Sequence, residues 1–137
     1  MRRALIALVA LVALAGCNLT AADSITPTPS DRRIEFVFPA SGVIVPEGEE
    51  VLIQLLAQDP AGVARVQLMV DDLPHLEATP VDAPTVPVFV VDMNWLASRA
   101  GLHGMTAVSY RADGSFSATR SILVEVEAAA EATDEGS

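Results

Sequence analysis

The 137-residue chain carries a formal net charge of −10, with eight arginines, no lysine and eighteen acidic residues. The length suffices for one domain of ordinary size. The shortage of basic residues argues against nucleic-acid binding, because no stripe of positive charge is available to displace counterions from phosphates. Hydrophobic residues make up 51% of the chain, and their density is highest in its first seventeen positions. The remainder has the apolar content of an average globular domain and a net charge of −12.

The first residues have the three parts of an export signal. Arg2 and Arg3 precede an apolar run over residues 4–14, which small residues follow. At 1.5 Å per residue this run is too short to cross about 30 Å of hydrocarbon, so it fits a signal peptide better than a transmembrane helix. We therefore expect residues 1–16 to form a cleavable signal peptide.

The end of this signal, Leu14-Ala15-Gly16-Cys17, resembles the lipobox of bacterial lipoproteins. The resemblance implies that cleavage makes Cys17 the new N-terminus and that its thiol is acylated. Cys17 is the only cysteine, so an exported protein could not use it in an intramolecular disulfide. The alternative is cleavage after Ala13-Leu14-Ala15, which would release a soluble protein. We favour lipidation of Cys17 and a location on the outer face of a bacterial cell membrane.

Two polar segments flank the middle of the chain. Residues 17–33 follow the lipidation site and are rich in Thr, Ser, Asp and Pro, a composition that cannot bury enough apolar surface to order itself. The repeat Thr26-Pro27-Thr28-Pro29 favours an extended conformation. Residues 128–137 are small and acidic. We interpret residues 17–33 as a disordered linker and residues 128–137 as a disordered tail.

The pattern between these segments is that of β-strands. Alternating or β-branched apolar runs separated by turn residues predict strands at 34–38, 51–57, 63–70, 86–95, 104–111 and 115–127. Alternation places Val66, Leu68 and Val70 on one face of their strand, and Ile122, Val124 and Val126 on the inner face of the last strand.

Turn signals separate most of these strands. The sequence predicts turns at Asp59-Pro60-Ala61-Gly62 and at Asp113-Gly114, where Asp-Gly favours a hairpin. The segment Leu73–Pro87 contains four prolines and is expected to be long and irregular. The one competing helix, over Asn94–Arg99, is a single turn at most.

Residues 34–127 resemble a bacterial immunoglobulin-like domain. The motifs that carry the resemblance are Phe38-Pro39-Ala40-Ser41-Gly42, Pro46-Glu47-Gly48-Glu49, Ala57-Gln58-Asp59-Pro60-Ala61-Gly62-Val63, Val66–Asp72, Trp95, Gly101-Leu102-His103, Ala112-Asp113-Gly114 and Ile122–Val126. The resemblance implies an all-β fold, a single antiparallel β-sandwich of about seven strands. Asp71-Asp72 stands where the family has Asp-Gly, and no cysteine pair is present. This family has no shared catalytic residues, so the resemblance says little about a ligand.

The residues that could carry chemistry are few. His75 and His103 are the only histidines, and a zinc site needs three or four converging ligands. We interpret His103, at the family's strand-entry histidine, as structural and His75 as exposed. No serine lies in a G-x-S-x-G turn and no cysteine remains free after lipidation. We therefore expect no catalytic residues, no cofactor and no enzymatic activity.

Two ligand classes nevertheless have candidate residues. Asp59, Asp71, Asp72 and Asp113 lie in expected turns, and Ca²⁺ prefers several turn oxygens. We favour a simpler role for these aspartates, which start turns by bonding their own backbone, and so expect no metal site. Among the aromatic residues, Phe36, Phe38, Phe89 and Trp95 follow core patterns, whereas Tyr110 and Phe116 flank the Asp113-Gly114 turn and could reach a sugar.

The sequence thus favours a membrane-anchored lipoprotein whose immunoglobulin-like domain is a non-catalytic display, adhesion or protein-interaction module. The alternative is a small ligand-binding lipoprotein, in which the Leu73–Pro87 segment and the Asp113 turn line a carbohydrate or calcium site. The expected partners are the membrane, through the lipid on Cys17, and a protein or glycan of the cell envelope, but no nucleic acid.

Overall fold

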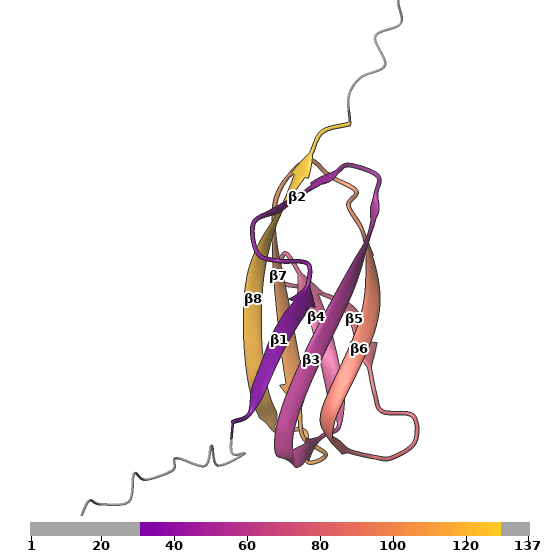
Figure 1. Cartoon of the computed structure of the whole chain (residues 1–137), viewed down its shortest axis with the longest axis vertical. Coiled ribbons are helices and arrows are strands. Elements are labelled where there is room, and N and C mark those ends of the chain that lie inside the picture. Colours follow the sequence, from indigo (N-terminus) through magenta and orange to yellow (C-terminus); the bar gives the residue numbers. More distant parts are fainter. Residues whose placement is uncertain (1–30, 130–137) are drawn as a thin grey trace, which may run out of the picture.

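The structure of the chain is a computed structural model that describes residues 31–129 (Figure 1). The signal peptide, the first fourteen residues of the predicted linker and most of the predicted tail lie outside the described residues. The described part forms eight strands: β1 (Arg33–Phe38), β2 (Val43–Pro46), β3 (Glu50–Val63), β4 (Arg65–Val70), β5 (Leu73–Ala78), β6 (Val86–Leu96), β7 (Gly101–Tyr110) and β8 (Phe116–Glu127).

The strands form two sheets that face each other. One sheet has the order β1-β3-β6, and the other has the order β2-β8-β7-β4-β5. All neighbouring strands are antiparallel except β2 and β8, which run parallel. The all-β sandwich expected from the sequence is confirmed, with β2 and β5 as strands that the apolar pattern did not reveal.

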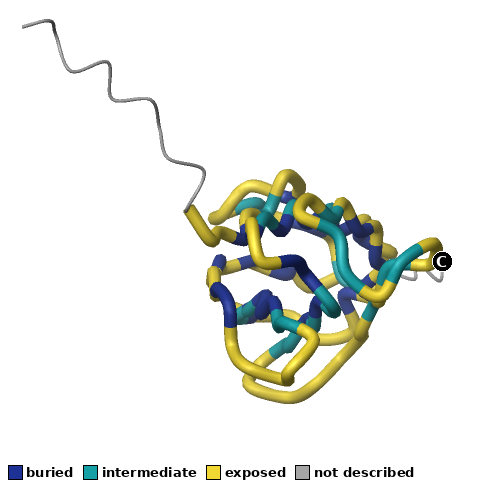
Figure 2. The backbone as a smooth tube through the Cα atoms, turned by 90° about the horizontal axis from the view of Figure 1, so that it is seen from below, coloured by how far each residue is buried: buried dark blue, intermediate teal, exposed yellow. Residues whose placement is uncertain are grey.

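Alternation along the strands builds the core between the sheets. In β3, Val51, Ile53, Leu55 and Ala57 are buried, and Leu52 between them is exposed. β8 buries Ile122, Val124 and Val126 and exposes Glu125 and Glu127, as predicted. Buried segments run through the interior of the molecule and exposed segments lie around its outside (Figure 2). Each fully buried aliphatic side chain contributes ~1.5–3 kcal/mol, so this inner layer holds the two sheets together.

The turn predicted at Asp59–Gly62 is wrong, because β3 continues through it to Val63. The register of β3 against β6 shifts between Gln58 and Val63, so the turn residues produce a bulge and not a reversal. The strand predicted over residues 63–70 is also wrong at its start. Val63 ends β3 in one sheet and Arg65 begins β4 in the other, because an alternating pattern does not record which sheet a residue belongs to.

In the middle of the chain, one further expectation is wrong and the competing helix does not form. Leu73–Pro87 is not irregular throughout, since its first six residues form β5 along the edge of the five-stranded sheet. Asn94–Arg99 forms no helical turn, because Asn94, Trp95 and Leu96 complete β6. In both places pairing with a neighbouring strand, β4 or β3, overrides the local signal.

The Asp71-Asp72 pair makes the tight turn between β4 and β5. Both residues have left-handed backbone angles, with φ of 52° and 66°. Two consecutive positive φ values are typical of the hairpin turn whose twist matches that of the strands. Aspartate tolerates this region better than most residues, so Asp-Asp replaces the Asp-Gly of the resembled family here.

Prolines mark the open edges of the sandwich. Pro46, Pro74 and Pro87 lie in β2, β5 and β6, each an outer strand of its sheet. Proline has no N–H to donate to a ladder, so these positions suit edges and discourage uncontrolled pairing. In the part of the chain that the structure describes, no helix is long and apolar enough to cross a membrane.

Candidate functional site

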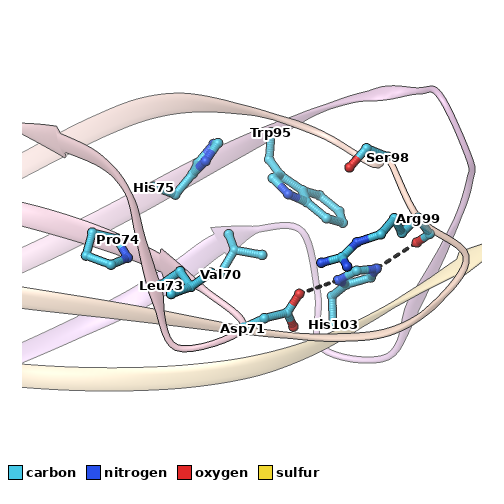
Figure 3. A pocket seen from close by; sticks show the side chains of 9 residues that line it. All are labelled: Val70, Asp71, Leu73, Pro74, His75, Trp95, Ser98, Arg99 and His103. Carbon is cyan, nitrogen blue, oxygen red and sulfur yellow. Dashed lines mark hydrogen bonds and ion pairs between the residues drawn. The ribbon is translucent and has the colours of Figure 1, made fainter.

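A cleft of about 240 Å³ opens at the end of the sandwich where the β4–β5 turn approaches the loop between β6 and β7 (Figure 3). Its lining residues are Val70, Asp71, Leu73, Pro74, His75, Trp95, Ser98, Arg99 and His103. Both histidines of the chain therefore lie in one cleft. They come from different strands, β5 and β7, which the sequence alone did not place together.

His103 is the buried centre of this cleft. Its Nδ1 lies 2.6 Å from Oδ2 of Asp71, and its Nε2 lies 2.7 Å from the carbonyl oxygen of Arg99 (Figure 3). The ring also makes an edge-to-face contact with the Trp95 indole, with ring centroids 5.3 Å apart. Internal contacts thus occupy both ring nitrogens, in agreement with the structural role expected for His103.

The ionisation of His103 is coupled to that of Asp71. Burial disfavours the charged imidazolium, but the hydrogen bonds to the Arg99 carbonyl and to Asp71 outweigh it, so the pKa of His103 is raised above 6.5. Burial likewise opposes ionisation of Asp71, yet its bonds to His103 and to the backbone N–H of Gly104 leave the pKa of Asp71 lowered. The pair therefore favours imidazolium and carboxylate together.

His75 lies at the rim of the same cleft. Its side chain is exposed, as expected, and its Nε2 lies 3.1 Å from the carbonyl oxygen of Asn94 in β6. This contact links the edge strand of one sheet to the edge strand of the other.

A second polar cluster surrounds Asp59, which is fully buried in β3. Its carboxylate accepts hydrogen bonds from Nε and Nη2 of Arg111 at 2.7 and 3.1 Å, from the Ser117 hydroxyl at 2.6 Å and from the Ala61 backbone N–H at 2.9 Å. These bonds connect β3 to the start of β8 in the opposite sheet. The Arg111 guanidinium is the main cause that lowers the pKa of Asp59 to about 2; burial opposes it, and Ser117 and Ala61 add to it.

The four aspartates considered for calcium do not converge. Asp59 is held by Arg111, Asp71 by His103, and Asp113 accepts the Ser115 N–H at 2.8 Å within its own turn. Among residues 31–129, no three His, Cys, Asp or Glu side chains come together as metal ligands. Asp113 does not line the cleft that Leu73 and His75 share.

The aromatic residues divide between core and surface. Trp95 is buried as predicted, and Phe36 and Phe89 are half-buried against the core, but the prediction for Phe38 is wrong, since it is 51% exposed. The backbone of β1 bulges between Phe36 and Phe38, which directs only the first of them inward.

Tyr110 and Phe116 are cross-strand neighbours in β7 and β8, beside a register shift. The extra residue at this bulge turns Ser117 inward, where it reaches Asp59, and leaves Phe116 55% exposed. The Arg65 guanidinium covers the Tyr110 ring, with its central carbon 3.9 Å from the ring centroid. The two aromatics that the sequence placed near solvent thus lie side by side.

Cys17, the predicted lipidation site, lies outside the described residues. Sequence reasoning missed Arg111 and Ser117 as partners of the buried Asp59, and the Arg99 carbonyl as a partner of His103. Only the spacing of a hydroxyl and an arginine around the Asp113-Gly114 turn could have indicated the Asp59 cluster, and this spacing is too common to be informative.

A comparison with protein families gave a match at the start of the chain. The family model of the prokaryotic membrane lipoprotein lipid attachment site matches residues 1–18, a range that includes Cys17. A comparison with curated proteins gave no match.

Solved structures share the arrangement of strands. The fibronectin(III)-like modules of Clostridium thermocellum CbhA have a TM-score of 0.58 and 23% identity, over 71% of this chain and 99% of theirs. The CARDB domain of the PF1109 protein from Pyrococcus furiosus, solved with di-metal ions, has a TM-score of 0.52 and 14% identity, over 69% and 88%. An endo-beta-1,4-mannanase from Thermotoga petrophila reaches a TM-score of 0.52 at 16% identity, over 72% of this chain and 20% of that one. At these identities the likeness shows the fold alone.

Proposed function

We propose that this chain, an exported bacterial membrane lipoprotein with an immunoglobulin-like domain, serves as a non-catalytic interaction module at the cell surface. The observation that carries the proposal is how the ionisable groups of the domain are used. His103, Asp71 and Asp59 each bond to other groups of the protein. Within residues 31–129, no buried side-chain nitrogen or oxygen lacks a partner. Groups engaged in this way hold the fold together and are poorly placed to transfer protons to a substrate.

The free edge of β6 is the element best suited to bind a protein partner. The backbone N–H of Ala97 donates to the carbonyl of Glu49, the residue just before β3, while the carbonyl of Asn94 meets His75 instead. Because successive residues of a strand point their backbone groups to opposite sides, the even-numbered residues of β6 face away from β3. Val88 and Val90 are two of these even-numbered residues, and their side chains are exposed. An extended segment of a partner could pair with this edge by strand addition.

A charged side chain on this edge tests the proposal. We expect Val90→Lys to abolish the cross-linked protein adducts that wild-type protein forms on intact cells, because lysine on an edge strand opposes pairing. Leu123→Lys, on the exposed face of the other sheet, is the matched control and should leave the adducts unchanged. If the wild-type protein forms no adducts on cells, or if Val90→Lys retains them all, the interaction at β6 is wrong.

We further propose that Cys17 is the acylated residue. Its place in the lipobox and its status as the only cysteine support this assignment. Cys17→Ser should move the protein from the membrane fraction to the soluble fraction or leave the signal uncleaved. A variant that is processed and still bound to the membrane would contradict the assignment.

Carbohydrate binding is the second candidate, and the exposed Phe116 beside the half-buried Tyr110 favours it. Adjacent aromatic side chains provide a surface on which the apolar face of a sugar ring can stack. Phe116→Ala should then remove binding in a glycan-array screen, whereas Phe38→Ala, another exposed phenylalanine, should retain it. An array on which the wild-type domain binds no glycan would exclude this candidate.

A further inference from the structure

The two hydrogen bonds of His103 set a requirement on the protonation of its ring. The partners of Nδ1 and Nε2 are the Asp71 carboxylate and the Arg99 carbonyl, and both are acceptors. A neutral imidazole carries one N–H and can satisfy one of them, whereas the imidazolium carries two. The observed geometry is therefore that of the doubly protonated ring.

We infer that His103 is a pH-sensitive latch, which holds the loop of residues 97–100 against the β4–β5 turn only while its ring carries both protons. The loop and the turn come from different sheets of the sandwich, since β6 leads into the loop and β4 leads into the turn. His103 is the group that bonds to both, from its place near the start of β7 (Figure 3).

When the His103 ring loses one proton, its bond to the loop is lost and its bond to the turn is kept. The bond to Asp71 joins a donor to a carboxylate and is stronger than a bond between neutral groups, so the neutral ring keeps its proton on Nδ1. Asp71 is also held by the backbone of Gly104, to which its N–H and its Oδ1 both bond. Nε2 would then direct a lone pair at the Arg99 carbonyl oxygen, only 2.7 Å away. This repulsion is relieved when the loop moves away.

The charged groups around His103 come from the β4–β5 turn and from the loop. Asp71 approaches from the β4–β5 turn and Arg99 from the loop, while His75 shares the cleft from β5. On β8 the residue opposite His103 is the apolar Val124, and on β6 the contact is with Trp95. Burial and the Arg99 charge disfavour the imidazolium, and the two hydrogen bonds and the Asp71 charge favour it, with a raised pKa as the net result.

The direction of the pH dependence follows from these groups. Because the pKa of His103 is higher in the folded protein than its unfolded value of about 6.5, the latch is fully closed below that pH. It opens as the pH rises through the folded pKa. Ser98 and Arg99 line the cleft with the buried Trp95, so their departure uncovers the indole. A rise in pH through the folded pKa of His103 would thus expose apolar surface that is covered below pH 6.5.

Trp95 reports directly on this change, because it is the only tryptophan and contacts the His103 ring. Imidazolium quenches indole fluorescence more strongly than neutral imidazole does. The sample is the full soluble chain without its signal, which contains the domain of residues 31–129. We expect its tryptophan emission to rise with a single midpoint above pH 6.5. Hydrogen-exchange protection of residues 97–101, corrected for intrinsic rates, should fall about tenfold through the same midpoint, the effect of losing one hydrogen bond.

Three variants test whether His103 itself is the group that titrates. Asp71→Asn removes the carboxylate charge and should move the fluorescence midpoint to lower pH, whereas His103→Gln should abolish the transition. His75→Gln is the matched control and should leave the midpoint unchanged, since His75 does not bond to the loop. Slow hydrogen exchange in the core of β3 shows for each variant that the domain is folded.

The inference fails if the wild-type emission and loop protection do not change between pH 6.5 and 10. It fails also if the transition persists in folded His103→Gln, or if His75→Gln abolishes it.

Discussion

The hydrogen bonds of the buried Asp59 carboxylate connect the two sheets, so their removal should lower the stability of the whole domain. Asp59→Asn keeps the size and shape of the side chain but removes its charge. One of its two oxygens, which now accept from Arg111, Ser117 and Ala61, becomes an NH₂ group that faces donors. At least one of these donors loses its partner.

The size of the effect can be worked from the pKa of Asp59. A fall from 3.8 to about 2 on folding corresponds to ~2 kcal/mol of stabilisation of the ionised group at neutral pH. Donors left without a partner add to this loss, and breaking a buried ion pair costs ~3–5 kcal/mol in general. We expect Asp59→Asn to lower the free energy of unfolding at pH 7 by ~3 kcal/mol and the midpoint of thermal unfolding by roughly 15 °C.

The pH dependence gives a second, independent check. The pKa of Asp59 is lower in the folded protein than in the unfolded chain, so its contribution is complete above the unfolded value of 3.8 and disappears as the pH falls towards 2. The difference in unfolding free energy between wild type and Asp59→Asn, measured by urea denaturation, should therefore shrink by ~2 kcal/mol between pH 5 and pH 2.

Asp92→Asn is the matched control for this prediction. Asp92 is exposed in β6 and accepts one hydrogen bond from the Gln54 side chain at 2.9 Å. Its substitution should change stability by less than ~0.5 kcal/mol. If the two variants have the same stability at pH 7, or if their difference is independent of pH, Asp59 does not connect the sheets as the contacts imply.

The core and a close contact supply two more predictions. Leu55→Ala should lower the free energy of unfolding by ~2–5 kcal/mol, because Leu55 is fully buried. Leu52→Ala, at a 46% exposed position in the same strand, should lower it by less than ~1 kcal/mol. Equal losses of the two variants in urea denaturation would contradict the assigned core. Gly62→Ala should cost more than ~1 kcal/mol, because φ is +102° and the added Cβ would lie 2.7 Å from the Thr85 side chain. Thr85→Ala removes the Oγ1 but keeps the Cβ that would also lie 2.7 Å away, so it should recover only part of that loss. Full recovery in thermal unfolding would show that neither the backbone angle nor the contact with this Cβ matters.

Local patterns predicted the strands well where one face is buried and the other is solvated. β8 shows this most clearly, since Ile122, Val124 and Val126 alternate with exposed residues along one well-paired strand. The same reasoning failed at Asp59-Pro60-Ala61-Gly62. The Asx hydrogen bond from Ala61 to Asp59 does form there, but pairing of β3 with β6 on either side of it converts the turn into a bulge.

Short edge strands were the other source of error. β2 and β5 have few buried residues, so no apolar alternation announces them. Each exists because a strand with a buried face, β8 or β4, offers a row of backbone groups for pairing. Such strands depend on a neighbour and not on their own pattern, and for β2 that neighbour lies about eighty positions later in the sequence.

The sequence by itself determined the export signal with its single cysteine, the acidic and lysine-free character of the domain, and its all-β class. These properties depend on composition and on contacts between near neighbours, which the chain displays in order. Only the tertiary structure decided that Asp59 meets Arg111 and Ser117, and that His103 meets Asp71 and the Arg99 carbonyl. Most of these partners lie 32 to 58 residues apart, and the packing of two sheets brings them together in a way that no local pattern records.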